Sequence, residues 1–284
     1  MNPPLDRVAI VGVGLLGASL GLALKARGLA AQIVGVGRRK VSLDTALEVG
    51  AIDAVAPNPA AAAAEADLLI VATPAALVVS ILDEVRGANN PNLVVTDVAS
   101  TKVAICGHAA AIWPAPRRFV GSHPMAGGEK FGPEHGRPDL YEDTVCLVEE
   151  SSELDPVARA AVCRLWESVG ARVVSVSPGE HDPILARTSH LPHVVASAVA
   201  ALAAEGGAGS LFVGNGFRDL TRIADSRPEV WRDICLTNRT ALLESLSGLD
   251  ARLREFAAIL AAGDAGRLDA FFEQGREGRR KVIE

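Results

Sequence analysis

The fold is decided near the start of the chain by residues 8–17, which are VAIVGVGLLG. An apolar run ends in glycines spaced GxGxxG, and a helix-length segment, residues 15–27, follows. In this context the first glycine permits a tight turn, the second lets the backbone approach a pyrophosphate, and the third lets the helix pack on the strand. The free N–H groups at the helix start can bind the phosphates. The pattern predicts a dinucleotide-binding loop, and the alternative is a glycine-rich turn without a ligand.

Short apolar runs alternate with helix-length segments as far as Ser177. Runs that are apolar on both faces are typical of a parallel sheet covered by helices, so residues 1–178 are predicted to form a doubly wound α/β domain of the Rossmann type. Two later runs, 144–148 and 172–176, are expected to be edge strands around a helix centred on Val162. The strand-forming runs before them are residues 8–11, 33–36, 68–72, 93–96 and 119–121.

The character of the sequence changes at residues 177–180, SPGE. A capping box with proline at the first helical position indicates a helix start. Helical periodicity without a convincing strand follows, so residues 179–284 are predicted to form an all-helical domain. Its apolar faces, above all between residues 236 and 262, exceed what so small a domain can cover. We therefore expect it to pack on the first domain and on a second copy of the chain, as a homodimer.

The composition excludes several classes of protein. The 284 residues carry 28 basic and 34 acidic side chains, and a net charge of −6 argues against nucleic acid or an anionic membrane as partner. No apolar run reaches the roughly 18 residues of a membrane span, and the amino terminus does not resemble a signal peptide. A cytoplasmic location is therefore expected. The 4 cysteines are widely spaced, which argues against a disulfide framework and a metal site.

The segment after the second apolar run distinguishes between the two nicotinamide dinucleotides. Sites selective for NAD carry an acidic residue about 20 positions after the loop, where it binds the ribose 2′-hydroxyl. Here residues 36–40 are VGRRK, without a carboxylate. Arginines in that position can bind the 2′-phosphate of NADP, so NADP is favoured over NAD, with a solvated basic turn as the alternative. The expected cofactor-binding residues are Gly12, Gly14, Leu15, Leu16, Gly17, Arg38, Arg39, Thr73, Pro74 and Ser100.

Two polar residues follow neighbouring strands of the predicted sheet. Ser100 lies in residues 97–102, DVASTK, and His123 lies in residues 121–127, GSHPMAG. Ligands of open α/β sheets bind at the carboxyl ends of the strands, so both residues should face the crevice beside the nicotinamide. A histidine can accept a proton near neutral pH, as oxidation at a hydroxyl-bearing carbon requires. His123 and Ser100 are therefore the candidate catalytic residues, and a purely structural histidine is the alternative.

The helical half carries polar residues at helical spacing. Asp182, Ser189 and His193 are separated by seven and four residues, so they are expected on one face of the helix that begins after Ser177. Pro192 removes a backbone hydrogen bond and should kink this helix. Polar residues at a kink indicate the lining of a cleft, and a solvated helix face is the alternative.

Further along, Arg218 and Arg222 are four residues apart and could both point toward an anionic substrate. The loop at residues 128–141 is rich in charge, glycine and proline. It is either a lid over the site or an exposed insertion.

The motifs together resemble the prephenate/arogenate dehydrogenase family of tyrosine biosynthesis. They occur in the family's order and cover most of the chain, from residue 7 to about 240. The HPMAG and SHLPH segments are the specific part of the match, whereas the glycine-rich loop alone is not. The matching segments are residues 12–17, 97–102, 121–127, 189–193 and 216–224.

The resemblance implies an oxidative decarboxylation of prephenate or arogenate to 4-hydroxyphenylpyruvate or tyrosine. Hydride would pass from the hydroxyl-bearing ring carbon to NAD(P), carbon dioxide would leave the opposite carbon, and the ring would become aromatic. His123 would accept the hydroxyl proton, Ser100 would hold the hydroxyl, and Arg222 would bind the substrate carboxylate. Trp231 and Glu129 are expected near the site from the resemblance alone, Glu129 in a polar network that gates the cleft. The expected substrate-binding residues are Ser189, His193, Arg218, Arg222, Trp231 and Glu129.

Two other functions share part of the pattern. A 3-hydroxyacid dehydrogenase has the same layout, but its class uses a lysine of the second domain, and residues 180–248 contain none. A non-catalytic dinucleotide sensor would need only the glycine-rich loop. It gives no reason for Ser100, His123, Ser189 and Arg222 to occur together.

Overall fold

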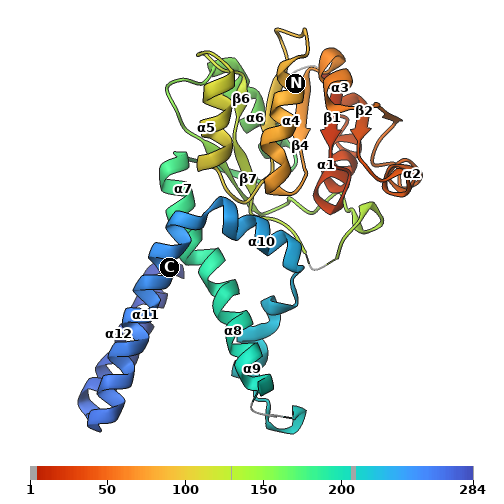
Figure 1. Ribbon diagram of the computed structural model, residues 1–284. Helices are drawn as coiled ribbons and strands as arrows, with labels where there is room; N and C mark the ends of the chain where they lie inside the picture. The colour runs from red at the N-terminus through yellow and green to blue at the C-terminus, as the bar shows by residue number, and fades with distance from the viewer. Residues whose placement is uncertain (1–4, 129, 206–208, 284) are drawn as a thin grey trace.

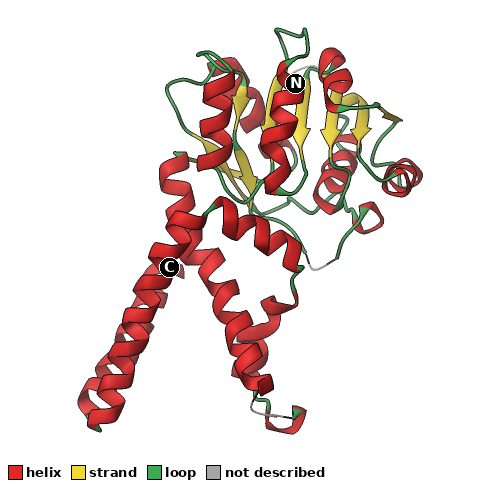
Figure 2. Ribbon diagram, in the orientation of Figure 1, coloured by secondary structure: helices red, strands yellow, loops and turns green. Residues whose placement is uncertain are grey.

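The computed structural model describes residues 5–128, 130–205 and 209–283 (Figure 1). The strands lie in one half of the molecule, and two arms built of helices extend from it (Figure 2). At the centre of the main sheet the arrowheads of the strands point toward the helical half. The carboxyl ends of the strands, where ligands of such sheets bind, therefore face the junction of the two halves.

The main sheet has six strands in the order β3-β2-β1-β4-β5-β6, and every pairing is parallel. This order confirms the predicted doubly wound sheet and puts the point where the strand order reverses between β1 and β4. The sequence pattern missed β3, which is only two residues long. The strands are β1 (Leu5–Val11), β2 (Ala30–Val36), β3 (Ala54–Val55), β4 (Leu68–Val71), β5 (Val94–Asp97) and β6 (Phe119–Val120).

Helices cover both faces of this sheet. Val8 and Ile10 of β1 pack into one buried cluster, and Ala9 and Val11 pack into another on the opposite face. Burial on both faces explains why the strands are continuous apolar runs instead of alternating ones. The helices of this half are α1 (Leu15–Ala26), α2 (Lys40–Glu48), α3 (Pro59–Glu65), α4 (Ala75–Arg86), α5 (Val103–Ile112) and α6 (Pro156–Ser168).

A second, smaller sheet begins where the chain leaves β6. It contains β7 (Ser122–Pro124), β8 (Val145–Glu149) and β9 (Arg172–Val176), with β7 antiparallel and β9 parallel to β8. The runs predicted at 144–148 and 172–176 are therefore strands, and they belong to this separate sheet. Its first strand carries His123.

The helical half begins at Pro178, directly after β9. The predicted capping box is present, because Ser177 Oγ accepts a hydrogen bond from the Glu180 backbone and the Glu180 side chain accepts one from the Ser177 backbone. The described part of this half contains no strand, and none of its helices is long and apolar enough to cross a membrane. Its helices are α7 (Pro178–Leu185), α8 (Leu191–Glu205), α9 (Asn215–Thr221), α10 (Pro228–Thr237), α11 (Arg239–Ala262) and α12 (Ala265–Ile283).

The helix around Pro192 differs from the sequence prediction. A π-helical turn, Ala186–His190, separates α7 from α8 and changes the number of residues per turn. A face calculated from α-helical spacing therefore does not extend across it. Asp182 is bonded to the start of α5, whereas His193 stacks on Trp231, so the prediction of one shared face is wrong.

Candidate active site

The glycine-rich loop has the geometry of a phosphate-binding turn. Gly12 has φ +100°, and a Cβ there would lie 2.5 Å from the carbonyl oxygen of Ala72. A Cβ on Gly17 would lie 2.1 Å from the carbonyl oxygen of Gly12. A Cβ on Gly14 would meet no atom within 4 Å, and the start of α1 has no side-chain cap. Two glycines are thus required by packing, and the third leaves open space beside a helix N-terminus that suits a pyrophosphate.

The end of β4 adds an unpaired polar atom beside this loop. Thr73 Oγ1 is buried and has no hydrogen-bond partner in the described part of the chain. Buried polar atoms normally have a partner, so Thr73 fits a contact with a bound cofactor. Pro74 next to it is exposed at the start of α4. Leu15 and Leu16, in the first turn of α1, are partly buried and pack against the core.

The turn after β2 presents its basic side chains to solvent. Arg38 and Arg39 are exposed and form no ion pair within the described residues, whereas Lys40 pairs with Asp44 at 2.8 Å. A Cβ on Gly37 would meet only Leu43 and Val13, at 3.4 Å or more. This turn therefore has both free cations and space for a larger group.

A buried carboxylate holds the two strand ends together. Asp97 accepts hydrogen bonds from the backbone N–H groups of Ala99 at 3.0 Å and Ser122 at 3.1 Å, and it pairs with the Lys102 ammonium. These bonds fix the loop that carries Ser100 next to the strand that carries His123. Ser100 is partly buried, and its hydroxyl has no hydrogen-bond partner in the described residues.

His123 lies on β7, only 7% exposed. Its Nδ1 lies 2.9 Å from Nε2 of His181 on α7. Its Nε2 has no hydrogen-bond partner in the part of the chain that the structure describes. Burial lowers the pKa of His123 well below its ordinary value, and repulsion from His181 and Lys102 lowers the pKa further. His123 is therefore neutral at pH 7, as a proton acceptor must be.

The next member of this chain of hydrogen bonds is a carboxylate. His181 Nδ1 lies 2.7 Å from Asp182 Oδ1, and Asp182 also accepts the backbone N–H groups of Lys102 at 2.7 Å and Val103 at 3.0 Å. Burial alone would raise the pKa of Asp182, but these hydrogen bonds outweigh burial and hold the pKa below its ordinary value. Asp182 is therefore an ionised acceptor. The sequence placed Asp182 near the site and missed His181.

A third buried histidine lies on the π turn. Asn238 Nδ2 donates to the backbone carbonyl of Asp182 at 2.8 Å and lies 3.1 Å from Nδ1 of His190. Burial lowers the pKa of His190 to about 4, and its Nε2 is buried without a partner in the described residues. The sequence analysis missed His190 and Asn238, although His190 lies inside the SHLPH segment.

Three predicted substrate-binding residues lie together near His190, whose ring centroid is 6.2 Å from that of Trp231. His193 stacks on Trp231 with ring centroids 3.5 Å apart. Burial lowers the pKa of His193, a backbone bond at Ile223 opposes the shift, and the nearby Arg222 adds to it. His193, Trp231 and Arg222 are therefore neighbours.

The remaining predicted substrate-binding residues are Ser189, Arg218 and Glu129. Ser189 is partly buried on the π turn, beside His190. Arg218 is exposed on α9, and the backbone N–H of Arg222 at the end of this helix donates to the carbonyl of Arg218, so the two residues keep α-helical spacing. That both side chains point toward an anionic substrate stays a prediction. Glu129 lies outside the described residues.

The loop at 128–141 is anchored along its second part. Tyr141 Oη donates to the Leu16 carbonyl at 2.7 Å, and Arg137 N donates to Ser19 Oγ at 3.0 Å. At the other end the Arg227 guanidinium lies 4.9 Å from the ring centroid of Phe131. The loop thus contacts both α1 and the start of α10. Its role as a lid stays a prediction.

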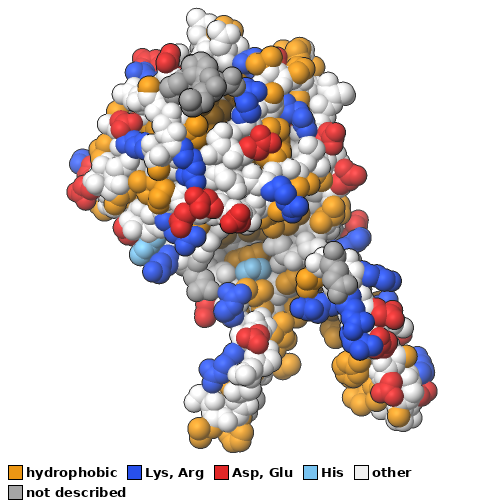
Figure 3. Space-filling view, turned by 180° about the vertical axis from the view of Figure 1, so that it is seen from behind, with side chains coloured by type: hydrophobic (Ala, Val, Ile, Leu, Met, Phe, Trp, Pro, Cys, Tyr) orange, Lys and Arg blue, Asp and Glu red, His pale blue; other side chains and the backbone are white. Residues whose placement is uncertain are grey.

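The surface is hollowed at the junction of the two halves (Figure 3). Histidine and apolar side chains are visible in the hollow where the arms leave the sheet-bearing half, with Lys and Arg around them (Figure 3). Among the residues that the structure describes, no group of His, Cys, Asp or Glu could hold a metal ion.

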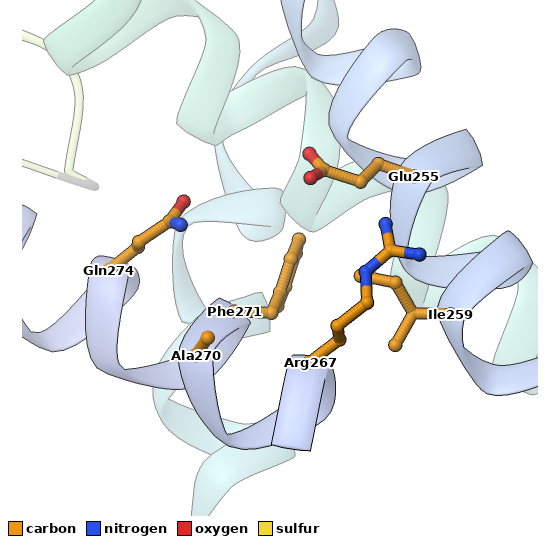
Figure 4. A pocket seen from close by; sticks show the side chains of 6 residues that line it. All are labelled: Glu255, Ile259, Arg267, Ala270, Phe271 and Gln274. Carbon is orange, nitrogen blue, oxygen red and sulfur yellow. The ribbon is translucent and has the colours of Figure 1, made fainter. Parts of the chain in front are cut away.

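A separate small pocket lies within the α11–α12 hairpin (Figure 4). The pocket is lined by Glu255, Ile259, Arg267, Ala270, Phe271 and Gln274.

Two family models match the chain in succession. Residues 20–175 match the nucleotide-binding domain of prephenate dehydrogenase, and residues 177–274 match the dimerization domain of the same family. The prephenate dehydrogenase of Bacillus subtilis is 31% identical over 284 residues, which cover 98% of this chain and 76% of the relative.

Solved structures are similar over the whole chain. The structure of prephenate dehydrogenase from Aquifex aeolicus in complex with hydroxyphenyl propionate and NAD+ has a TM-score of 0.91 at 28% identity, with 99% and 100% of the two chains covered. The arogenate dehydrogenase of Synechocystis has a TM-score of 0.82 at 27% identity, covering 98% of this chain and 100% of the other.

Proposed function

Because the chain belongs to the prephenate dehydrogenase family, we propose that it oxidatively decarboxylates prephenate or arogenate with an NAD(P) cofactor. The observation that supports this function best is the position of His123. It is a buried, neutral histidine with a free Nε2, on β7 directly after β6, a strand of the sheet that carries the dinucleotide loop. Such a group can take one proton from a substrate held beside the cofactor.

Each side chain has a task in this reaction. His123 accepts the proton of the ring hydroxyl at Nε2, and the Ser100 hydroxyl orients the same oxygen. Arg222, next to His193 and Trp231, binds a substrate carboxylate, and the aromatic rings exclude water from the ring of the substrate. The bound NAD(P)+ supplies the hydride acceptor. Aromatisation drives the loss of carbon dioxide, so the protein mainly positions groups and removes one proton.

The residues present fit the dinucleotide. The open face of Gly14 accommodates a pyrophosphate, and the unpaired Thr73 hydroxyl can bond to the cofactor at the end of β4. Residues 1–178 form the cofactor domain of the proposed enzyme, and residues 179–284 form the domain for substrate and dimerisation.

Among the two dinucleotides we propose NADP. Gly37 offers no carboxylate to a ribose 2′-hydroxyl, and Arg38 is exposed without an ion-pair partner in the described chain. An arginine–phosphate pair at such a site contributes roughly 1.5–3 kcal/mol, or about 10- to 100-fold in affinity. Arg38→Ala should therefore raise KM for NADP by that factor and leave KM for NAD nearly unchanged.

The cofactor proposal has a matched gain-of-function test. Gly37→Asp adds a carboxylate where its Cβ meets nothing closer than 3.4 Å, so it should shift the preference toward NAD. Arg164→Ala, an exposed arginine on α6, is the control. Equal losses for both dinucleotides in Arg38→Ala, or a wild-type preference for NAD, would overturn the proposal.

The helical half is proposed to form a homodimer. Leu236 on α10 and Leu243, Leu253 and Leu260 on α11 are all exposed in the single chain. Exposed apolar residues that recur along one helix pair are typical of a face that a second subunit covers. Light scattering at micromolar concentration should give twice the mass of one chain, and a monomer would contradict the proposal.

The central experiment uses the purified protein with prephenate or arogenate and with NAD+ or NADP+. The absorbance of the reduced nicotinamide measures each of the four combinations. We expect turnover with at least one substrate and faster turnover with NADP+. The absence of turnover in all four combinations would refute the proposed dehydrogenase activity.

A further inference from the structure

We propose that His181, held by Asp182, is the positioning residue that keeps the acceptor nitrogen of His123 free for the substrate hydroxyl. This inference rests on the proposed function, in which His123 Nε2 is the proton acceptor. His181 does not need to touch the substrate. It acts by deciding which nitrogen of the His123 ring carries the proton.

The direction of each hydrogen bond follows from the carboxylate. Asp182 is ionised and accepts two backbone N–H groups besides its contact with His181, so it can only accept. His181 Nδ1 must therefore donate to Asp182 Oδ1 over 2.7 Å. A His181 ring whose one proton lies on Nδ1 has its lone pair at Nε2, which is then an acceptor. The partner at 2.9 Å, His123 Nδ1, must be the donor.

This hydrogen-bond direction determines whether His123 Nε2 can accept a proton. When Nδ1 of neutral His123 carries the proton, Nε2 carries the lone pair. A neutral imidazole in water prefers the opposite arrangement, with the proton on Nε2. His123 would then present an N–H group to the substrate hydroxyl and could not take its proton. Inside the site, the hydrogen bond from His123 Nδ1 to His181 favours the proton on Nδ1 and leaves the lone pair on Nε2.

The other groups around His123 do not provide the same bond. The Lys102 ammonium, which follows β5, is a donor and is paired with Asp97. His190 on the π turn has its Nδ1 beside the Asn238 amide. Cys146 lies on the neighbouring strand β8, and burial raises the pKa of its thiol, so it stays protonated. Among the described residues, His181 is therefore the acceptor for His123 Nδ1.

Besides its bond to His181, Asp182 makes three hydrogen bonds that make this arrangement rigid. Two of them bind the backbone at the start of α5, and the carbonyl of Asp182 accepts from Asn238 at the start of α11. The side chain and the backbone of one residue thus connect three elements. His181 is held at a defined distance from the strand that carries His123, as a positioning role requires.

The test compares two side chains of similar size at position 181. In His181→Gln the amide can accept from His123 Nδ1 and donate to Asp182, whereas His181→Met can do neither. We expect His181→Met to lower kcat by about 10²-fold or more, with a smaller effect on KM, since an orienting partner acts on the proton transfer. The kcat of His181→Gln should be at least tenfold higher than the kcat of His181→Met.

A second readout does not depend on activity. The chain has 6 histidines, so ¹⁵N NMR spectra of labelled protein can be assigned with single-histidine variants. Wild type and His181→Gln should show His123 protonated at Nδ1, and His181→Met should show it protonated at Nε2. His108→Gln is the control, because this partly buried histidine on α5 also bonds a carboxylate, Asp83, at 2.9 Å. It should change neither readout.

The outcomes separate this inference from the proposed function. If His181→Met keeps the wild-type protonation site of His123, or if Gln and Met lower kcat equally while both fold, the inference is wrong. If wild type shows the expected protonation site of His123 but no turnover with either substrate, the proposed function is wrong. His181 would then fix the protonation site of His123 without a role in this reaction. Thermal unfolding of each variant shows that the fold is intact.

Discussion

The two glycines at either end of the first helical turn should respond to the same substitution in opposite ways. Adding a methyl group at Gly17 puts its Cβ 2.1 Å from the carbonyl oxygen of Gly12 and 3.0 Å from Ile10 Cγ2. The Gly12 backbone is held by a 2.8 Å hydrogen bond to Val36, so it cannot easily move away. At Gly14 the same methyl group meets no atom within 4 Å.

The magnitudes follow from these contacts. Overpacking against a fixed backbone atom costs up to about 3 kcal/mol, and the better helix propensity of alanine returns about 1 kcal/mol. Gly17→Ala should therefore lose about 2 kcal/mol of stability, which lowers Tm by roughly 4–8 °C in a chain of this size. For Gly14→Ala the poorer helix cap and the reduced entropy of the unfolded chain nearly cancel, so Tm should change by less than about 2 °C.

The effect on cofactor binding should be the reverse. The methyl group of Gly14→Ala occupies the space proposed for the pyrophosphate, so KM for the dinucleotide should rise at least about tenfold, or about 1.4 kcal/mol. Thermal unfolding without cofactor and steady-state kinetics with varied cofactor measure the two effects separately. A Gly14→Ala protein with unchanged KM would refute the assignment of this loop. An unchanged Tm in Gly17→Ala would show that the turn absorbs the contact.

Three further predictions concern the site residues. His123→Asn should lower kcat by about 10²- to 10⁴-fold with less effect on KM, and a near wild-type kcat would remove His123 from the mechanism. Arg222→Ala should act mainly through KM, because a carboxylate-binding residue holds substrate in the ground and transition states alike; a fall in kcat at constant KM would contradict this role. Protein stability should fall as the pH drops from 6.5 toward 4. The pKa of His190 is about 4 in the folded chain, whereas its ordinary value is 6.5, so the unfolded chain binds more protons in this pH range. Urea unfolding should show a loss of roughly 1–3 kcal/mol between pH 7 and pH 4.5 that is smaller in His190→Gln, and a flat profile would show that His190 is not buried in neutral form.

Much of the fold and part of the site follow from local sequence patterns. The apolar runs and the glycine spacing predicted the parallel sheet and the loop at residues 12–17, because both are produced by neighbouring residues. The apolar runs correctly placed Ser100 after the end of β5 and His123 after the end of β6, and the catalytic roles of both residues stay predictions. The helix start at Pro178 was evident from its capping box.

Other features have no local signal. The π turn cannot be recognised from α-helical periodicity, and it moves Asp182 and His193 to different surroundings. The assignment of β8 and β9 to a second sheet depends on which strands pair, which a run of apolar residues does not specify.

By itself the sequence determined that His123 follows the end of a strand of the dinucleotide-binding sheet. Only the tertiary structure decided the state of its ring. His181 lies 58 residues further along the chain, and it reaches His123 because Asp182 and Asn238 fasten α7 to the starts of α5 and α11. The physical reason is that a side chain's proton position and pKa depend on burial and on the hydrogen bond at its other nitrogen. Both are set by residues that only folding brings into contact.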